Sequence, residues 1–113
     1  MKNNTFKIPK KSNLKELKFE YIDSTIDQYY RPIQGYFMKK RLKIIFDDLL
    51  KIEKKYNDPN ILDIGYGGGT FFPALANFSN NLFGIDLHHE LEIVNNILTK
   101  ENLNAKISTQ SIF

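Results

Sequence analysis

The sequence predicts an α/β fold in which a small parallel sheet is covered by helices. Short segments at residues 61–64 and 82–86 are apolar at consecutive positions, which is typical of strands buried on both faces of a parallel sheet. A glycine-rich stretch follows the first of these segments directly. Segments with helical periodicity alternate with the strands. Such alternation favours parallel strands joined by right-handed crossovers, here with the strand order 3-2-1.

A helix is expected at residues 38–56, before the first strand. Apolar side chains recur there at steps of four and three residues, which places them on one stripe: Met38, Leu42, Ile45, Leu49, Ile52 and Tyr56. Asn57, Asp58 and Pro59 should end this helix, because these residue types favour turns.

The other elements alternate after the glycine-rich stretch. A helix is expected at residues 70–78, with Pro73 in its first turn, where a missing N–H costs little. A further helix at residues 90–100 should turn its apolar positions inward, and a short strand at 105–109 should complete the sheet. The inward positions are Leu91, Val94, Ile97 and Leu98.

Two segments precede this domain, which is expected to cover residues 36–113. Residues 1–18 are predicted to form a flexible basic arm, because Pro9 and six lysines disfavour a packed element. Residues 19–35 are rich in aromatic side chains and are broken by Pro32 and Gly35, so they are expected to pack on the domain or to form a lid.

Charge is unevenly distributed, since residues 1–55 contain 14 of the 16 basic and 7 of the 13 acidic residues. A nucleic acid or an anionic surface is therefore a candidate partner, although a solvated lysine-rich tail and helix face explain the charge more simply.

Composition excludes several classes of protein. The chain has 113 residues and no cysteine, so disulfide frameworks and thiolate metal sites are excluded. It has no apolar run long enough to span a membrane and no apolar core of a secretory signal, so we expect a cytoplasmic protein that is not an integral membrane protein. His88 and His89 are adjacent and point in different directions. We therefore predict no metal site and place both in an exposed turn.

The glycine-rich stretch is the strongest functional signal. It reads D-x-G-x-G-x-G, formed by Asp63, Gly65, Gly67 and Gly69. Glycines allow a sharp turn and a close approach of a ligand to the main chain. Asp86 follows Gly65 by 21 residues at the end of the second strand, where an acid can accept both ribose hydroxyls of a nucleoside. Loop and acid together predict a site for an adenosine-containing cofactor.

Two classes of cofactor fit such a site. A dinucleotide-binding domain has G-x-G-x-x-G, but its third glycine would fall on Thr70 here. The pattern instead resembles motif I of class I S-adenosylmethionine-dependent methyltransferases. An acid at Asp63 suits a ligand that carries an ammonium and a sulfonium better than a pyrophosphate. A dinucleotide-binding half-domain remains the alternative.

The resemblance covers residues from about 36 to the end, and it implies roles for single residues. Gly65, Gly67 and Gly69 would form the floor beneath the methionine part of S-adenosylmethionine. Asp63 would hold its amino group, and Asp86 would accept the ribose hydroxyls.

The same resemblance implies that Leu87 and Ile112 sandwich the adenine. Tyr66 would lean over the loop and shape the mouth of the pocket. Ser111 stands where many members of the family have an acid that meets the adenine amino group.

The resemblance also implies a three-layer Rossmann-like methyltransferase fold, which here would be truncated to the 3-2-1 sheet with helices mainly on one face. The first strand would then be an open edge, and the other face of the sheet would be bare.

We therefore expect the cofactor-binding half of a methyltransferase that is inactive as an isolated chain, with no catalytic residue of its own and an unknown methyl acceptor. A complementing chain at the edge of strand one is a candidate partner. A non-catalytic module that binds S-adenosylmethionine or acts as a scaffold once a partner completes it is a further alternative.

Overall fold

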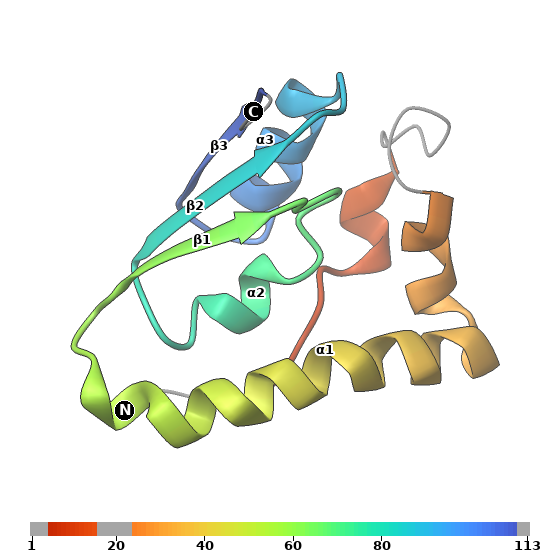
Figure 1. Ribbon diagram of the computed structural model, residues 1–113. Coiled ribbons are helices and arrows are strands. Elements are labelled where there is room, and N and C mark those ends of the chain that lie inside the picture. Colours follow the sequence, from red (N-terminus) through yellow and green to blue (C-terminus); the bar gives the residue numbers. More distant parts are fainter. Residues whose placement is uncertain (1–4, 16–23, 111–113) are drawn as a thin grey trace.

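The computed structural model describes residues 5–15 and 24–110, and these form the predicted parallel α/β arrangement. The strands are β1 (Asn60–Ile64), β2 (Asn81–Asp86) and β3 (Ala105–Thr109). They pair in parallel in the order β1-β2-β3, which confirms the predicted 3-2-1 sheet (Figure 1). The carboxyl ends of all three strands therefore lie at one edge of the sheet.

Within residues 5–15 and 24–110, three α-helices and three short 3-10 helices accompany the strands. The α-helices are α1 (Pro32–Ile52), α2 (Phe72–Leu75) and α3 (Leu91–Lys100). The 3-10 helices are η1 (Lys11–Leu14), η2 (Ser24–Tyr30) and η3 (Glu53–Lys55). Figure 1 shows α2 and α3 close to the sheet, with the long helix α1 running past α2.

Helix α1 begins six residues earlier than the sequence predicted. Pro32 occupies its first turn, where proline is tolerated. The helix continues through Gly35, where the missing side chain lets the helix backbone pack closely against η2. A Cβ at Gly35 would lie 2.5 Å from the carbonyl oxygen of Tyr29. The two residues that suggested a break therefore mark a tight helix junction.

The burial of α1 also differs from the predicted stripe. Ile45 and Ile52 are 47 and 43% exposed, whereas Phe46 is only 2% exposed. Tyr56, also part of the predicted stripe, follows η3 beyond the end of α1 and is 59% exposed. The ring of Phe46 lies between Phe6, at 5.7 Å, and Phe78, at 5.3 Å. The helix thus packs through a position beside the stripe, because the N-terminal segment and α2 cover that side.

Helix α2 is shorter than expected, and the residues after it form turns. Several of the backbone bonds here are of the i to i+3 type, such as Asn77 N–H to the Ala74 carbonyl at 3.2 Å. The Asn77 side chain also donates to the Ala74 carbonyl at 3.0 Å and so competes for the groups that would continue an α-helix. Pro73 lies in the first turn, as predicted.

The main core lies between the sheet and α3. Phe72 and Val94 are fully buried, and Leu82, Ile97 and Leu98 are almost so. The predicted inward face of α3 is confirmed at Val94, Ile97 and Leu98, while Leu91 is half-buried.

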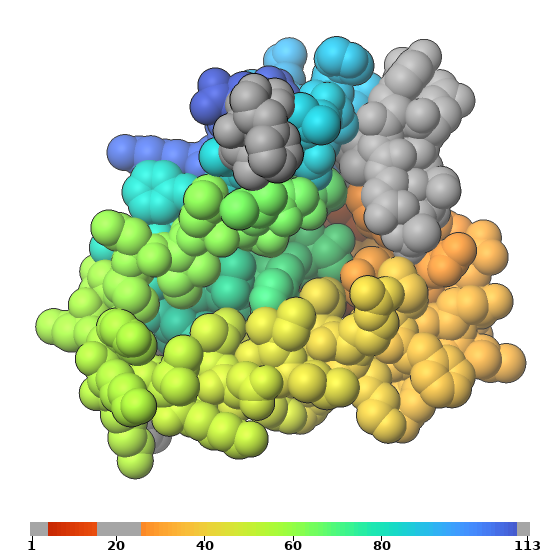
Figure 2. Space-filling view, in the orientation of Figure 1, coloured from red at the N-terminus to blue at the C-terminus, as the bar shows by residue number. Residues whose placement is uncertain are grey.

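The other face of the sheet has little cover. Leu62 and Ile64 of β1 are 49 and 62% exposed, and their register partners Phe83 and Ile85 are half-buried. In Figure 2 the green residues around β1 form part of the front surface. The helices therefore lie mainly on one face of the sheet, as predicted.

The N-terminal segment is packed over residues 5–15, where the sequence suggested a flexible arm. Pro9 and Leu14 are buried, and the Tyr30 hydroxyl donates to the Pro9 carbonyl at 2.6 Å. The Lys10 N–H and the Asn13 side chain both donate to Glu101, at 2.5 and 2.9 Å. Lysine-rich composition did not prevent packing, because Pro9 and Leu14 are buried while Lys10 takes part through its backbone N–H. The rest of the predicted arm, and residues 19–23 of the predicted lid, lie outside the described residues.

No helix in residues 5–15 and 24–110 is long and apolar enough to cross a membrane.

Candidate functional site

The glycine loop connects the carboxyl end of β1 to α2. Gly65, Gly67 and Gly69 have positive φ angles of 80, 57 and 81°, a conformation that side-chain-bearing residues rarely adopt. A Cβ at Gly65 would meet no atom within 4 Å, so the main chain is open there to an approaching molecule. At Gly69 a Cβ would lie 3.2 Å from Leu98, so this glycine serves the packing of the loop on α3.

Asp86 lies directly beside this loop. One of its carboxylate oxygens accepts the Gly67 N–H at 2.6 Å, and the other accepts the Leu87 N–H at 2.6 Å. The carboxylate thus ties the loop to the end of β2. Each oxygen keeps a further lone pair, so the group can still accept a hydrogen bond from a bound hydroxyl.

Asp63 is the second carboxylate of the site. It pairs in register with Gly84, so its side chain shares the helix-covered face with Leu82 and Asp86. Burial, and secondly the charge of Asp86, raises the pKa of Asp63 to about 6. The two acids therefore place strong negative potential at the mouth of the glycine loop.

A cavity of about 210 Å³ adjoins the loop. Asp63, Gly65 and Gly67 line one side, and Ile26 and Tyr29 of η2 line another. The volume is below the roughly 300–1,000 Å³ of pockets that hold whole drug-sized ligands. It is large enough for part of a nucleoside cofactor. The lid role predicted for residues 19–35 stays a prediction, and η2 is in place to cover this cavity.

Tyr66 is among the residues that line this cavity, and its ring packs into the core beside the loop. It is only 4% exposed, its ring centre lies 6.0 Å from that of Phe72, and its hydroxyl donates to the Ser108 carbonyl at 3.2 Å. Burial, and then the charge of Asp86, raises the pKa of Tyr66 to about 12. The ring finds room because β2 has a glycine, Gly84, beneath it.

His88 is buried, although the sequence suggested an exposed turn. It is 8% exposed, and its Nδ1 accepts the Glu90 N–H at 3.0 Å just before α3. Its Nε2 is buried and has no hydrogen-bond partner among the residues that the structure describes, and its ring meets Tyr66 edge-on at 5.2 Å. The only available signal was its place three residues before the start of α3, where a side chain can accept a backbone N–H.

Of the remaining predicted adenine-site residues, the structure describes Leu87 alone. Leu87 is 68% exposed at the end of β2, next to Asp86. Ile112 and Ser111 lie outside the described residues. Within residues 5–15 and 24–110, no group of three His, Cys, Asp or Glu residues is arranged to hold a metal ion.

Fold and site together define an α/β chain with a Rossmann-like parallel sheet, a glycine loop at the end of its first strand and an acid at the end of its second. The chain is 38% identical over 68 residues to a release factor glutamine methyltransferase from Fusobacterium nucleatum. This similarity supports a relationship to methyltransferases. The aligned part covers 55% of this chain and 19% of that enzyme, so the chain spans about a fifth of its relative. No protein-family model and no solved structure match the chain.

Proposed function

We propose that this chain is the cofactor-binding part of a class I methyltransferase and that it binds S-adenosylmethionine at the glycine loop. The observation that carries the proposal is the pair of carboxylates at the loop, where Asp63 lines the cavity and Asp86 accepts the Gly67 N–H. Burial, and then the charge of Asp86, raises the pKa of Asp63. Two negative charges beside one loop attract a cationic ligand and repel a pyrophosphate. The same observation weighs against the dinucleotide alternative.

The residues present fit the two ends of such a cofactor. Asp63 lines the cavity beside Gly65 and Gly67 and would hold the ammonium of the methionine part. Asp86 would accept the ribose hydroxyls with its remaining lone pairs, while it keeps the loop in place through Gly67. Leu87 and Ile112 would contact the adenine. Tyr66 would hold the glycine loop in position, because its hydroxyl donates to the Ser108 carbonyl of β3.

The bound cofactor would supply an electrophilic methyl group on its sulfonium. What this chain contributes is binding and orientation, which make up a large part of the rate in reactions that need two partners held in line. We assign no catalytic residue to the chain. Its methyl acceptor remains unassigned, and the cytoplasmic location stays a prediction.

Isothermal titration calorimetry with S-adenosylhomocysteine tests the site directly. We expect saturable binding that weakens about 10- to 100-fold in Asp86→Asn, because a hydrogen bond to a charged group contributes roughly 1.5–3 kcal/mol. Asp63→Asn should weaken binding by a similar factor. Asp48→Asn, on the exposed side of α1, is the matched control and should bind like the unchanged protein.

The result that would overturn the proposal is equal affinity in the Asp86 and Asp48 variants. Tighter binding of NAD than of S-adenosylhomocysteine would favour the dinucleotide alternative instead. Circular dichroism of each variant shows whether a lost affinity reflects a lost fold.

We further propose that β1 pairs with a strand of another polypeptide and that the complete site forms in that assembly. The exposed side chains of Leu62 and Ile64 support this idea, because β1 has the sequence of a strand buried on both faces. A methyltransferase activity, or a non-catalytic role as a scaffold, would then depend on that partner.

A further inference from the structure

A basic groove lies along the N-terminal half of α1, away from the glycine loop. The lining residues are Phe6, Pro32, Tyr36, Lys39, Lys40 and Lys43, and the hollow measures about 550 Å³. This volume lies within the roughly 300–1,000 Å³ of typical ligand pockets. The groove thus combines three ring-bearing side chains with three ammonium groups.

The two segments that form the groove carry only positive charge. Residues 5–15 contain four lysines and no acid, and residues 28–46 contain five basic residues and no acid. Asp27 and Asp47, which flank the second segment, pair with Arg31 and Lys43, and the other three basic residues of that segment outnumber them. A uniformly basic stretch of this length, formed by segments distant in the sequence, gives the groove a positive potential that attracts polyanions.

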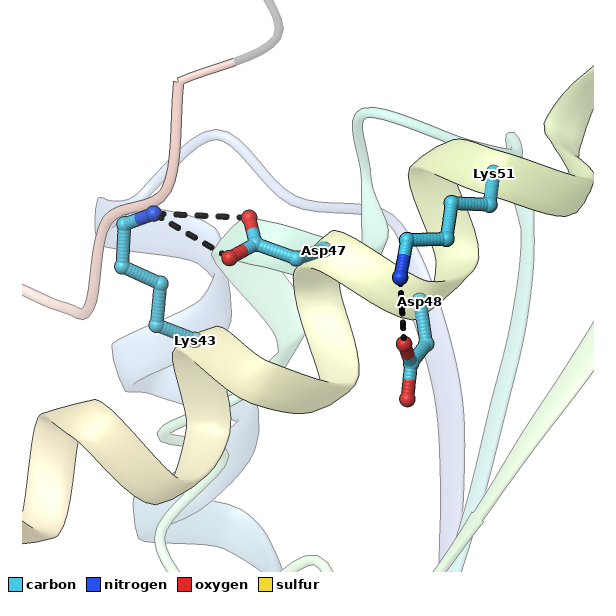
Figure 3. A network of polar contacts seen from close by, with 4 residues as sticks. All are labelled: Lys43, Asp47, Asp48 and Lys51. Carbon is cyan, nitrogen blue, oxygen red and sulfur yellow. Dashed lines mark hydrogen bonds and ion pairs between the residues drawn. The ribbon is translucent and has the colours of Figure 1, made fainter.

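Most of these charges are not neutralised within the molecule. Lys39 and Lys40 have no ion pair with any residue that the structure describes. Lys43 bonds to Asp47 at 3.3 Å, and both side chains are about half exposed (Figure 3). Such an exposed pair contributes about 0–1 kcal/mol, so an incoming phosphate can replace the carboxylate.

The aromatic wall of the groove is accessible. Tyr36 is 59% exposed, and the ammonium of Lys40 lies 5.8 Å from the centre of its ring. A flat base can stack on such a ring while its phosphates meet the neighbouring lysines. This combination of stacking platforms and cations is how proteins bind single-stranded nucleic acids without strong sequence preference.

We propose that this groove binds single-stranded nucleic acid, with Lys39, Lys40 and Lys43 on phosphates and Tyr36 stacked on a base. A duplex offers no free base face, and an acidic peptide offers charge without a stacking partner. The proposal is independent of the methyltransferase assignment, since none of these residues lines the glycine-loop site.

The test is fluorescence anisotropy of the full chain with a labelled oligouridylate at several salt concentrations. If about three phosphates are neutralised, the logarithm of the binding constant should fall with the logarithm of salt with a slope near −2. Tyr36→Ala should weaken binding about tenfold or more, because base stacking on an aromatic ring contributes roughly 1–3 kcal/mol. Lys39→Gln and Lys40→Gln should each weaken binding and flatten the salt slope.

Lys51→Gln is the matched control. It removes the same charge from the same helix, but Lys51 lies outside the groove and bonds to Asp48 at 3.5 Å. It should leave the affinity within about twofold, as the salt slope predicts for a charge that meets no phosphate.

Several results would overturn the proposal. These are no binding of the oligouridylate, equal losses in Lys51→Gln and Lys39→Gln, or full displacement of the oligouridylate by polyglutamate. Co-sedimentation with phosphatidylserine vesicles in the absence of oligouridylate binding would assign the groove to a membrane surface instead. Because the cofactor titration uses a different site, either proposal can fail while the other stands.

Discussion

At the scale of single residues, Asp63 is proposed to bind the cofactor, and it also lowers the stability of the folded protein at neutral pH. Its pKa is raised to about 6 in the folded protein, from an ordinary value of 3.8. The folded state therefore holds this proton more tightly than the unfolded state. The contribution of Asp63 to the free energy of unfolding therefore falls as the pH rises from about 4 through about 6. At neutral pH this contribution has been lost completely.

Asp63→Asn should accordingly stabilise the protein at neutral pH, even though it weakens cofactor binding. A shift of about two pKa units corresponds to about 1–3 kcal/mol, the upper end being the value without any solvent screening. Urea unfolding of both proteins across this pH range measures the difference. The gain should be close to zero near pH 4 and constant above about pH 7.

Asp48→Asn serves as the control for this pH dependence, since Asp48 is an exposed residue of α1. A gain in stability that is the same at all pH values would show that the asparagine acts through packing. In that case the electrostatic account of the site would be wrong.

Residue-level prediction from the sequence succeeded where backbone chemistry dictates the residue type. The three glycines have positive φ, as the motif indicated. The hydrogen bond from the Gly67 N–H to Asp86 was not specified by the spacing, and the ribose-binding role of Asp86 stays a prediction. Residue-level prediction failed for His88, which is buried, and it did not anticipate the burial of the Tyr66 ring, because burial of a polar ring depends on partners from other elements. Gly84 and the Ser108 carbonyl, which accommodate Tyr66, cannot be recognised from the residues around it.

At the scale of elements, strands were easier to predict than helices. β1 and β2 combine consecutive apolar residues with flanking turn residues, whereas β3 has only separated apolar positions. All three expected strands agree with the structure within one residue. The start of α1 was missed because proline and glycine, here Pro32 and Gly35, can either end a helix or be accommodated in one. They break a helix when nothing compensates, but here they begin a helix and pack it closely on η2.

Gly84 in the middle of β2 provides a test of how the elements fit together. An alanine Cβ would lie 2.6 Å from Cδ1 of Tyr66 and 2.8 Å from Cζ of Phe72. Both rings are buried and cannot turn aside freely. Gly84→Ala should therefore destabilise the fold by about 1–3 kcal/mol, the usual range for overpacking, and urea unfolding measures this change.

Ser108→Ala is the control on the neighbouring strand, because the Ser108 side chain points to the opposite face from Ile107 and leaves the Tyr66 acceptor, a backbone carbonyl, in place. A neutral effect of Gly84→Ala would mean that Tyr66 and Phe72 relax at little cost. Tyr66 could then not serve as a firm anchor for the glycine loop.

At the scale of the whole molecule, the uneven cover of the sheet decides how the protein behaves in solution. Helices lie over one face, while β1 exposes Leu62 and Ile64 at an edge of the sheet. Edge strands have unpaired backbone groups and are templates for association with another chain. We expect the isolated protein to self-associate as its concentration rises, until a partner strand covers this edge.

Replacing Leu62 and Ile64 together with lysine should suppress that association. Both side chains are about half exposed, so the change should cost little stability, within about 0.5 kcal/mol for each surface substitution. Sedimentation velocity over a series of concentrations measures the effect.

Ile33→Lys on α1 is the control, because Ile33 is 71% exposed and the substitution adds a lysine to a different part of the surface. If Ile33→Lys restores the monomer equally well, general surface hydrophobicity drives the association and β1 is not a specific pairing edge. If all variants and the unchanged protein remain monomeric, the open edge does not recruit strands, and the proposed partner of β1 must be abandoned.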